Sequence, residues 1–273
     1  MNKILVLTLV FINMINGHAQ DKPRKNSLGF NVGASYLVRQ DLIFSPFQHK
    51  DFTLGNFGLN YTRRASSYQQ ITLNYSNFNP MVLKPYEFSD HGETQKAYPH
   101  SFNLFDFDYL VGKKVKKAQR STLIVGGIFS ANIQAMNYVY GRFGNFGYFS
   151  TLGFGVFAQK EFLISKRNQL DVSLHLPLIA WLSRSPYLVN DDEFIENIGS
   201  HSGIKTFMSY LGDGKLVTWD KLQTFDLGLR HRYNYNDKLA FGVGYTVEFI
   251  HSYLSRDILS FRNSIQLSGE FSF

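Results

Sequence analysis

The sequence contains no cysteine, which excludes a disulfide framework, a thiolate metal site and a cysteine nucleophile. It has no apolar run of about 18 residues, so a bundle of membrane-spanning helices is also excluded. Only 18% of the residues are charged while 44% are hydrophobic, a composition too apolar for a disordered chain. Instead, the 273 residues include 26 Phe, 16 Tyr and 22 Gly, which leaves a globular or barrel-forming protein.

The N-terminus has the features of an export signal. Lys3 precedes a short apolar run at residues 4–12, and the small residues Gly17 and Ala19 occupy positions −3 and −1 of a cleavage site. A membrane anchor would need about 20 apolar residues. We therefore expect residues 1–19 to be a cleaved signal peptide and residues 20–273 to form one exported domain.

Apolar side chains alternate with small or polar ones in ten segments of the remaining chain. A period of two is typical of strands that have one apolar face. At about 10 to 15 residues, each segment is long enough to cross a bilayer at a tilt. The ten predicted strands are residues 28–38, 53–63, 68–78, 102–111, 122–136, 148–160, 169–178, 221–233, 239–249 and 261–273.

The connections between these strands alternate in length. The short ones are residues 64–67, 113–121, 161–168 and 234–238. The long ones are residues 40–52, 79–101, 137–147, 182–220 and 250–258. Short turns on one side and long loops on the other are typical of an outer-membrane barrel. The expected fold is therefore all-β, a transmembrane antiparallel up-and-down β-barrel of about ten strands.

The two faces of the strands support this fold over a soluble β-sandwich or lipocalin-like barrel, which places apolar residues inside. One face carries Gly, Ser and Asn, as at Gly29 and Asn31, and the other carries bulky Phe, Leu and Tyr. With the strand ends that they adjoin, the short turns carry eleven basic and two acidic residues. A basic rim suits anionic lipid headgroups, and its place on the turns of an exported chain argues against nucleic-acid binding.

The end of the chain resembles the closing strand of Gram-negative outer-membrane barrels, because Ile265, Leu267, Phe271 and Phe273 alternate up to a terminal aromatic residue. The resemblance covers the architecture of the whole mature chain and specifies no activity. It implies a location in the cell outer membrane. It also implies that Phe271 and Phe273 belong to the assembly signal that the barrel-assembly machinery reads during biogenesis.

Charged side chains on the predicted inner face form a candidate lumen network. A ten-stranded barrel encloses a narrow bore, and unpaired charges there cost several kcal/mol, so we expect them to pair. Two interpretations remain open: a network that blocks the bore, and a narrow channel for small solutes. The predicted members are Asp106, Asp108, Asp171, His175, Asp226, Arg230, Arg232, Glu248, Arg262 and Glu270.

Sequence patterns of known barrel enzymes are incomplete in this chain. Asp106 and Asp108 resemble the Asp pair of the omptin family of outer-membrane proteases, but the Asp-x-His that faces this pair in omptins does not occur. Outer-membrane phospholipases and lipid A deacylases carry His-x-Ser, which is also missing. The Ser and His of residues 199–203 have no acidic partner at a fixed spacing, and the eight His show no ligand spacing. We expect no catalytic, metal-binding or cofactor-binding residues.

Two of the long loops are rich in apolar and aromatic groups. Residues 182–220 include Phe194, Phe207 and Tyr210, and residues 79–101 include Tyr86. Such loops suit contact with a partner protein or surface ligand, or packing over the barrel mouth. The sequence thus favours an accessory or binding component of the outer membrane, with a narrow pore as the alternative and a hydrolase third.

Overall fold

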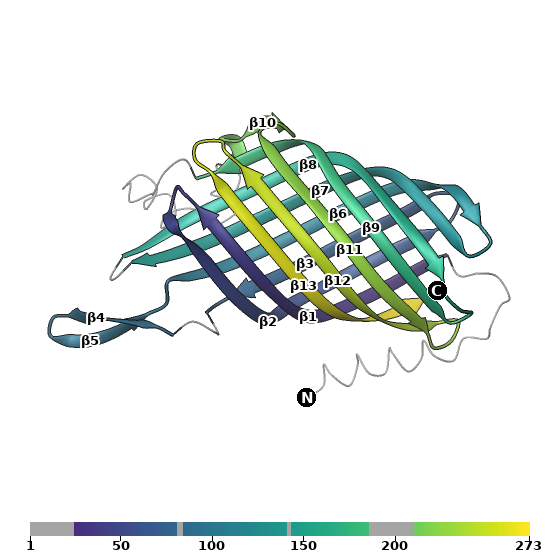
Figure 1. Ribbon diagram of the computed structural model, residues 1–273, viewed down its shortest axis with the longest axis horizontal. Coiled ribbons are helices and arrows are strands. Elements are labelled where there is room, and N and C mark those ends of the chain that lie inside the picture. The colour runs from purple at the N-terminus through teal and green to yellow at the C-terminus, as the bar shows by residue number, and fades with distance from the viewer. Residues whose placement is uncertain (1–24, 81–83, 141–142, 186–208, 210) are drawn as a thin grey trace.

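The computed structural model describes residues 25–80, 84–140, 143–185, 209 and 211–273. Ten long antiparallel strands close into a barrel in these residues (Figure 1). They are β1 (Asn26–Asp41), β2 (Ser45–Arg64), β3 (Tyr68–Phe78), β6 (His100–Ala118), β7 (Ser121–Tyr140), β8 (Phe143–Leu163), β9 (Asn168–Arg184), β11 (Leu222–Asn234), β12 (Leu239–Ser252) and β13 (Ile258–Ser272). Because β13 pairs with β1 and β8 pairs with β9, the barrel sheet closes on itself. The predicted ten-stranded antiparallel barrel is therefore confirmed.

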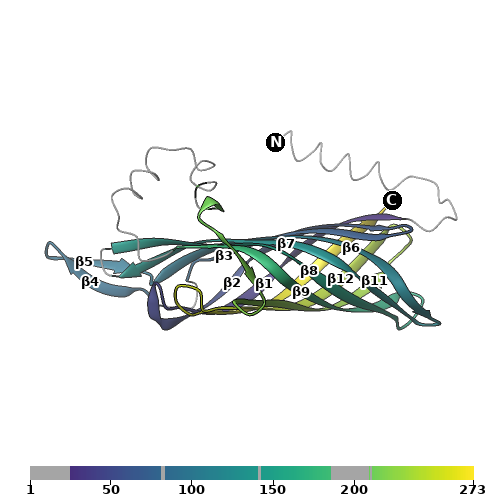
Figure 2. The same cartoon turned by 90° about the horizontal axis from the view of Figure 1, so that it is seen from above.

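Three short strands lie in the predicted long loops. β4 (Tyr86–Asp90) and β5 (Glu93–Ala97) form a separate hairpin, whose turn places His91 at φ 49° and Gly92 at φ 85°. This left-handed pair is the geometry that two-residue hairpin turns require. The hairpin projects beyond the barrel at the end opposite the C-terminus (Figures 1 and 2). β10 (Lys215–Thr218) pairs with β9 next to β11.

Several strands are longer than predicted, and the long loop expected at residues 40–52 is wrong. β1 and β2 are joined by residues 42–44 alone, and residues 45–52 belong to β2. The short connection expected at residues 113–121 is likewise mostly strand. In both places polar or charged residues replace the apolar half of the alternation, so the period of two is hidden in the sequence.

The outward face of the barrel is apolar, as Phe154 (64% exposed) and Leu267 (59% exposed) illustrate. We call the end of the barrel opposite the C-terminus the outer end. Towards it, the outward side chains of β1 and β2 change from Tyr36 and Phe52 to the polar Gln40, Gln48 and Lys50. An apolar band with aromatic residues at its edge is typical of barrels in a bilayer. Residues 39–51 at this end of β1 and β2 therefore lie beyond the band.

Glycine makes room for large inner side chains near the short-turn end, which holds residues 65–67 and the C-terminus. The ring of Phe157 lies against Gly112 on β6 and Gly126 on β7. A Cβ at Gly126 would come within 2.0 Å of the carbonyl oxygen of Val111 and 2.8 Å of the Phe157 ring. Only glycine allows this close approach of the two strands.

No helix among the described residues is long and apolar enough to span a membrane. The predicted signal peptide, residues 1–19, lies outside the described residues, as do residues 186–208 of the predicted loop 182–220. Residues 199–203 fall within that range.

Candidate functional site

The bore of the outer half is filled by apolar side chains. They come from every barrel strand except β2, and from β10 and the β1–β2 turn. Phe78, Phe102 and Phe149 are at most 1% exposed. We call this cluster the apolar core; its members are Leu37, Ile43, Phe44, Phe78, Phe102, Leu104, Met136, Tyr138, Phe149, Ala180, Leu182, Val217, Leu222, Ile250 and Ile258. These side chains pack against one another inside the barrel, as they do in the interior of a soluble protein.

Buried polar groups are set among these apolar side chains at the outer end. Arg39 donates from Nε to the Tyr138 hydroxyl at 3.2 Å and pairs through Nη2 with Asp41 at 3.2 Å. Arg184 from β9 reaches the other oxygen of Asp41 at 2.6 Å. Asp41 thus joins two guanidinium groups that would otherwise be buried without a counter-charge.

Two histidines and an aspartate form a chain of polar contacts beside this group. Nε2 of His100 is 3.2 Å from Oδ2 of Asp51, and Nδ1 of His100 is 3.3 Å from Nδ1 of His49. Burial, with the charges of His100 and Arg39 nearby, lowers the pKa of His49 to about 4. His49 is therefore neutral near pH 7.

A charged cluster lies below the apolar core. Arg262 on β13 pairs with Asp106 on β6 and with Glu248 on β12. Asn132 on β7 also donates to Asp106. A single guanidinium therefore holds two carboxylates from different sides of the bore.

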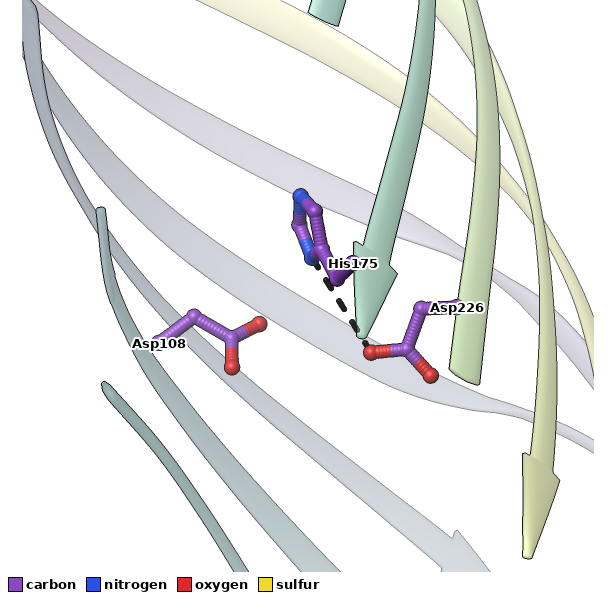
Figure 3. A group of neighbouring side chains, drawn as sticks. All are labelled: Asp108, His175 and Asp226. Atoms are coloured by element: carbon purple, nitrogen blue, oxygen red, sulfur yellow. Dashed lines mark ion pairs between the residues drawn. The ribbon is translucent and has the colours of Figure 1, made fainter. Parts of the chain in front are cut away.

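Three further side chains of this cluster point towards one another from different strands (Figure 3). Asp108 lies on β6, His175 on β9 and Asp226 on β11. One potential ligand atom of each lies within 4.8 Å of the other two, and Nδ1 of His175 is 4.0 Å from Oδ2 of Asp226. A cavity of about 50 Å³, lined by Asp106, Asp108, Asp226 and Glu248 among others, adjoins them.

The short-turn end holds a second ion-pair group. Glu270 accepts a hydrogen bond from Arg230 at 3.0 Å and forms an ion pair with Arg232 at 3.5 Å. Arg64 pairs with Glu161 at 3.4 Å. A polar cavity of about 150 Å³ lies inside the barrel here, and its lining includes Asn31, Asn60, Arg64, Asn74, Asp171, Arg230, Gln266 and Ser268.

The ten residues predicted for the lumen thus fall into two groups. Six lie in the middle cluster: Asp106, Asp108, His175, Asp226, Glu248 and Arg262. Arg230, Arg232 and Glu270 lie at the short-turn end with Asp171, which accepts from Gln169 at 2.6 Å rather than from a predicted partner. In the part of the chain that the structure describes, the ion pairs join residues within each group.

Sequence reasoning missed the buried polar group of the outer end: Arg39, Asp41, His49, Asp51, His100 and Arg184. Most of these residues were assigned to loops because their strand segments lack apolar alternation. Polar residues at every second position, His49, Asp51 and Thr53, are a sequence signal for a strand with a polar inner face. All three are buried on β2. Sequence reasoning places Arg64 and Glu161 in two of the short turns. In the structure they lie on β2 and β8 and form an ion pair with each other.

Comparisons with known proteins support the fold and give no closer relationship. No family model matches the chain, and no curated protein matches it. The outer membrane protease OmpT from Escherichia coli superposes with a TM-score of 0.58 at 5% identity, over 94% of this chain and 99% of that one. The translocator domain of the autotransporter NalP from Neisseria meningitidis gives 0.46 at 8% identity, over 99% of this chain and 95% of that one. The chain has the fold of outer-membrane β-barrels.

Likeness at this level of identity extends to the fold alone. Of the Asp106 and Asp108 pair, Asp108 lies near His175 and Asp226, and these two residues come from different strands. These groups also lie beneath the apolar core rather than at an open rim.

Proposed function

We propose that this chain is an integral outer-membrane protein whose barrel is closed to solutes and whose outer end binds a partner macromolecule. The apolar outward face supports insertion in a bilayer, since side chains such as Phe154 and Leu267 would be costly to expose to water over a continuous band. The outer-membrane barrels of similar fold support the choice of membrane.

The observation that carries the proposal is the apolar core of the outer half. A solute pore needs a polar, hydrated lumen along its whole length. Here the polar cavity of the short-turn end gives way to buried Phe78, Phe102 and Phe149. The narrow-pore alternative is therefore the weaker one.

The hydrolase alternative is weaker for a related reason. Asp106, Asp108, His175 and Asp226 lie below the apolar core, so a peptide or lipid at the outer rim does not reach them. Asp106 accepts from Asn132 and Arg262, and His175 pairs with Asp226, whereas a nucleophilic mechanism requires a serine or threonine hydrogen-bonded to the base.

Partner binding is supported by the hairpin of β4 and β5, which stands clear of the barrel (Figures 1 and 2). Its two strands pair with each other. The side chains of Glu93, Thr94 and Gln95 on β5 are exposed, so the hairpin presents a polar surface to a partner. The exposed Glu87 and Lys96 form an ion pair at 3.2 Å on its surface, which suits a polar interface.

The test is affinity isolation of a tagged chain from detergent-solubilised outer membranes, with quantitative mass spectrometry of whatever is retained. Replacement of residues 86–97 by a short Gly-Ser linker leaves every barrel strand intact. Deletion of the whole loop 182–220 would instead remove β10 and Val217 from the apolar core.

We expect one stoichiometric companion with the full chain and its loss with the linker variant. A control, Lys117→Gln on the exposed short-turn end of β6, should retain the companion. Isolation of the full chain alone would contradict the binding proposal.

A further inference from the structure

We propose that Asp108, His175 and Asp226 bind one divalent transition-metal ion inside the barrel (Figure 3). The inference is independent of partner binding at the outer end. An imidazole nitrogen with two carboxylate oxygens is a ligand set suited to ions such as Zn²⁺ and Mn²⁺.

The charges around the cluster support a bound cation. Four carboxylates converge there, from Asp106, Asp108, Asp226 and Glu248. Arg262 pairs with Asp106 and with Glu248, so its positive charge is already shared by two of the four carboxylates. Two ionised carboxylates that face each other in an enclosed bore repel strongly, and a cation between them removes this repulsion without protonation of either group.

The geometry also suits a metal ion. The three potential ligand atoms lie within 4.8 Å of one another, on β6, β9 and β11. Small side-chain rotations bring such atoms to the about 2.0–2.2 Å that Zn²⁺ requires from nitrogen and carboxylate oxygen. Strands fix the backbone of each ligand, so the set is rigid.

The surrounding space completes the site. The adjoining cavity of about 50 Å³ is large enough for water molecules to fill the remaining coordination positions. Asn74 lines both this cavity and the larger polar cavity of the short-turn end. The two cavities therefore lie next to each other inside the barrel, and the apolar core lies on the other side of the site, towards the outer end.

Sequence spacing gave no indication of this site. His175 and its two partners are far apart in the chain, and no two of them share a strand. Barrel closure brings them together, because β6 lies across the bore from β9 and β11.

The test uses the full chain, purified in detergent and freed of metal with a chelator. Isothermal titration with Zn²⁺, Mn²⁺, Ca²⁺ and Mg²⁺ gives stoichiometry and affinity, and the absorption spectrum of a Co²⁺-loaded sample reports nitrogen and oxygen ligands. Variants Asp108→Asn, His175→Gln and Asp226→Asn each remove one ligand. The matched control is His231→Gln, an exposed histidine on the same strand as Asp226.

We expect one Zn²⁺ or Mn²⁺ per chain, with affinity reduced about tenfold or more by each ligand variant and unchanged by the control. Circular dichroism of every variant verifies that the barrel is folded. The proposal is overturned if the folded chain binds neither ion. It is also overturned if the control weakens binding as much as the ligand variants do, or if only Ca²⁺ or Mg²⁺ binds.

Discussion

Arg262 on β13 forms an ion pair with Asp106 on β6, on the opposite side of the bore. The same guanidinium pairs with Glu248 on the neighbouring strand β12. Arg262 is 4% exposed, so these pairs are shielded from water. One side chain thereby connects two walls of the barrel just below the apolar core.

Removal of the cation should be costly because it leaves two carboxylates unpaired. We expect Arg262→Met to lower the free energy of unfolding by about 3–5 kcal/mol, the usual cost of breaking a buried pair from one side. Urea unfolding in lipid vesicles measures this. The double variant R262M/D106N should recover part of the loss, and an equal or larger loss in the double variant would contradict the pairing.

The close approach of β6 and β7 gives a second prediction with an internal control. A Cβ at Gly126 would meet the backbone of Val111 at 2.0 Å, so Gly126→Ala should destabilise the barrel by about 1–3 kcal/mol or prevent folding. At the adjacent Gly127 the nearest atom to a new Cβ is 3.8 Å away. Gly127→Ala should therefore fold normally, as followed by thermal melting. Equal Tm values for the two variants would be inconsistent with this packing.

Acid should destabilise the outer end through His49. Its pKa is about 4 in the folded chain against an ordinary value of 6.5, so the unfolded chain takes up a proton more readily. The stability contributed by neutral His49 is fully present above about pH 6.5 and is lost as pH falls from 6.5 towards 4.

The measurement is Tm by circular dichroism between pH 4 and pH 8. His49→Phe keeps a ring against Phe102 and Tyr138 but does not titrate. This variant should show a weaker dependence on pH than the unaltered chain in that window. Parallel curves would show that another group is responsible.

The apolar core should dominate the stability of the outer half. Phe102 is 1% exposed and contacts the rings of His100 and Tyr138. We expect Phe102→Ala to lower the free energy of unfolding by about 3–5 kcal/mol. Phe154→Ala, on the lipid-facing surface of β8, serves as the comparison and should cost less. A larger effect at Phe154 would argue against a packed interior.

Most of the barrel was predictable because the lipid-facing positions follow a simple rule. Side chains such as Leu28, Phe30 and Val32 alternate with small polar ones, and the bilayer requires this pattern over the whole band. Beyond the band the rule ends, since the outward side chains there face water. The sequence pattern consequently predicts a loop for the outer parts of β1 and β2, which are strand in the structure.

The inner face was less predictable. Its side chains form their contacts with residues on distant strands. Arg39 donates to Tyr138, and Arg262 pairs with Asp106. The alternation of side chains along a strand predicts which residues point into the barrel. It does not determine which residue lies opposite across the bore. The meeting of Asp108, His175 and Asp226 depends on strand order, tilt and register together.

Single-channel recording in a planar lipid bilayer tests the closed barrel most directly. We expect no steady conductance for the full chain, because the apolar core occupies the outer half of the bore. A variant with Phe78, Phe102 and Phe149 changed to Gly, verified as folded, should conduct. Its conductance serves as the positive control that the barrel inserts into the bilayer. Stable ohmic conductance of the unaltered chain would contradict the account and favour a narrow pore.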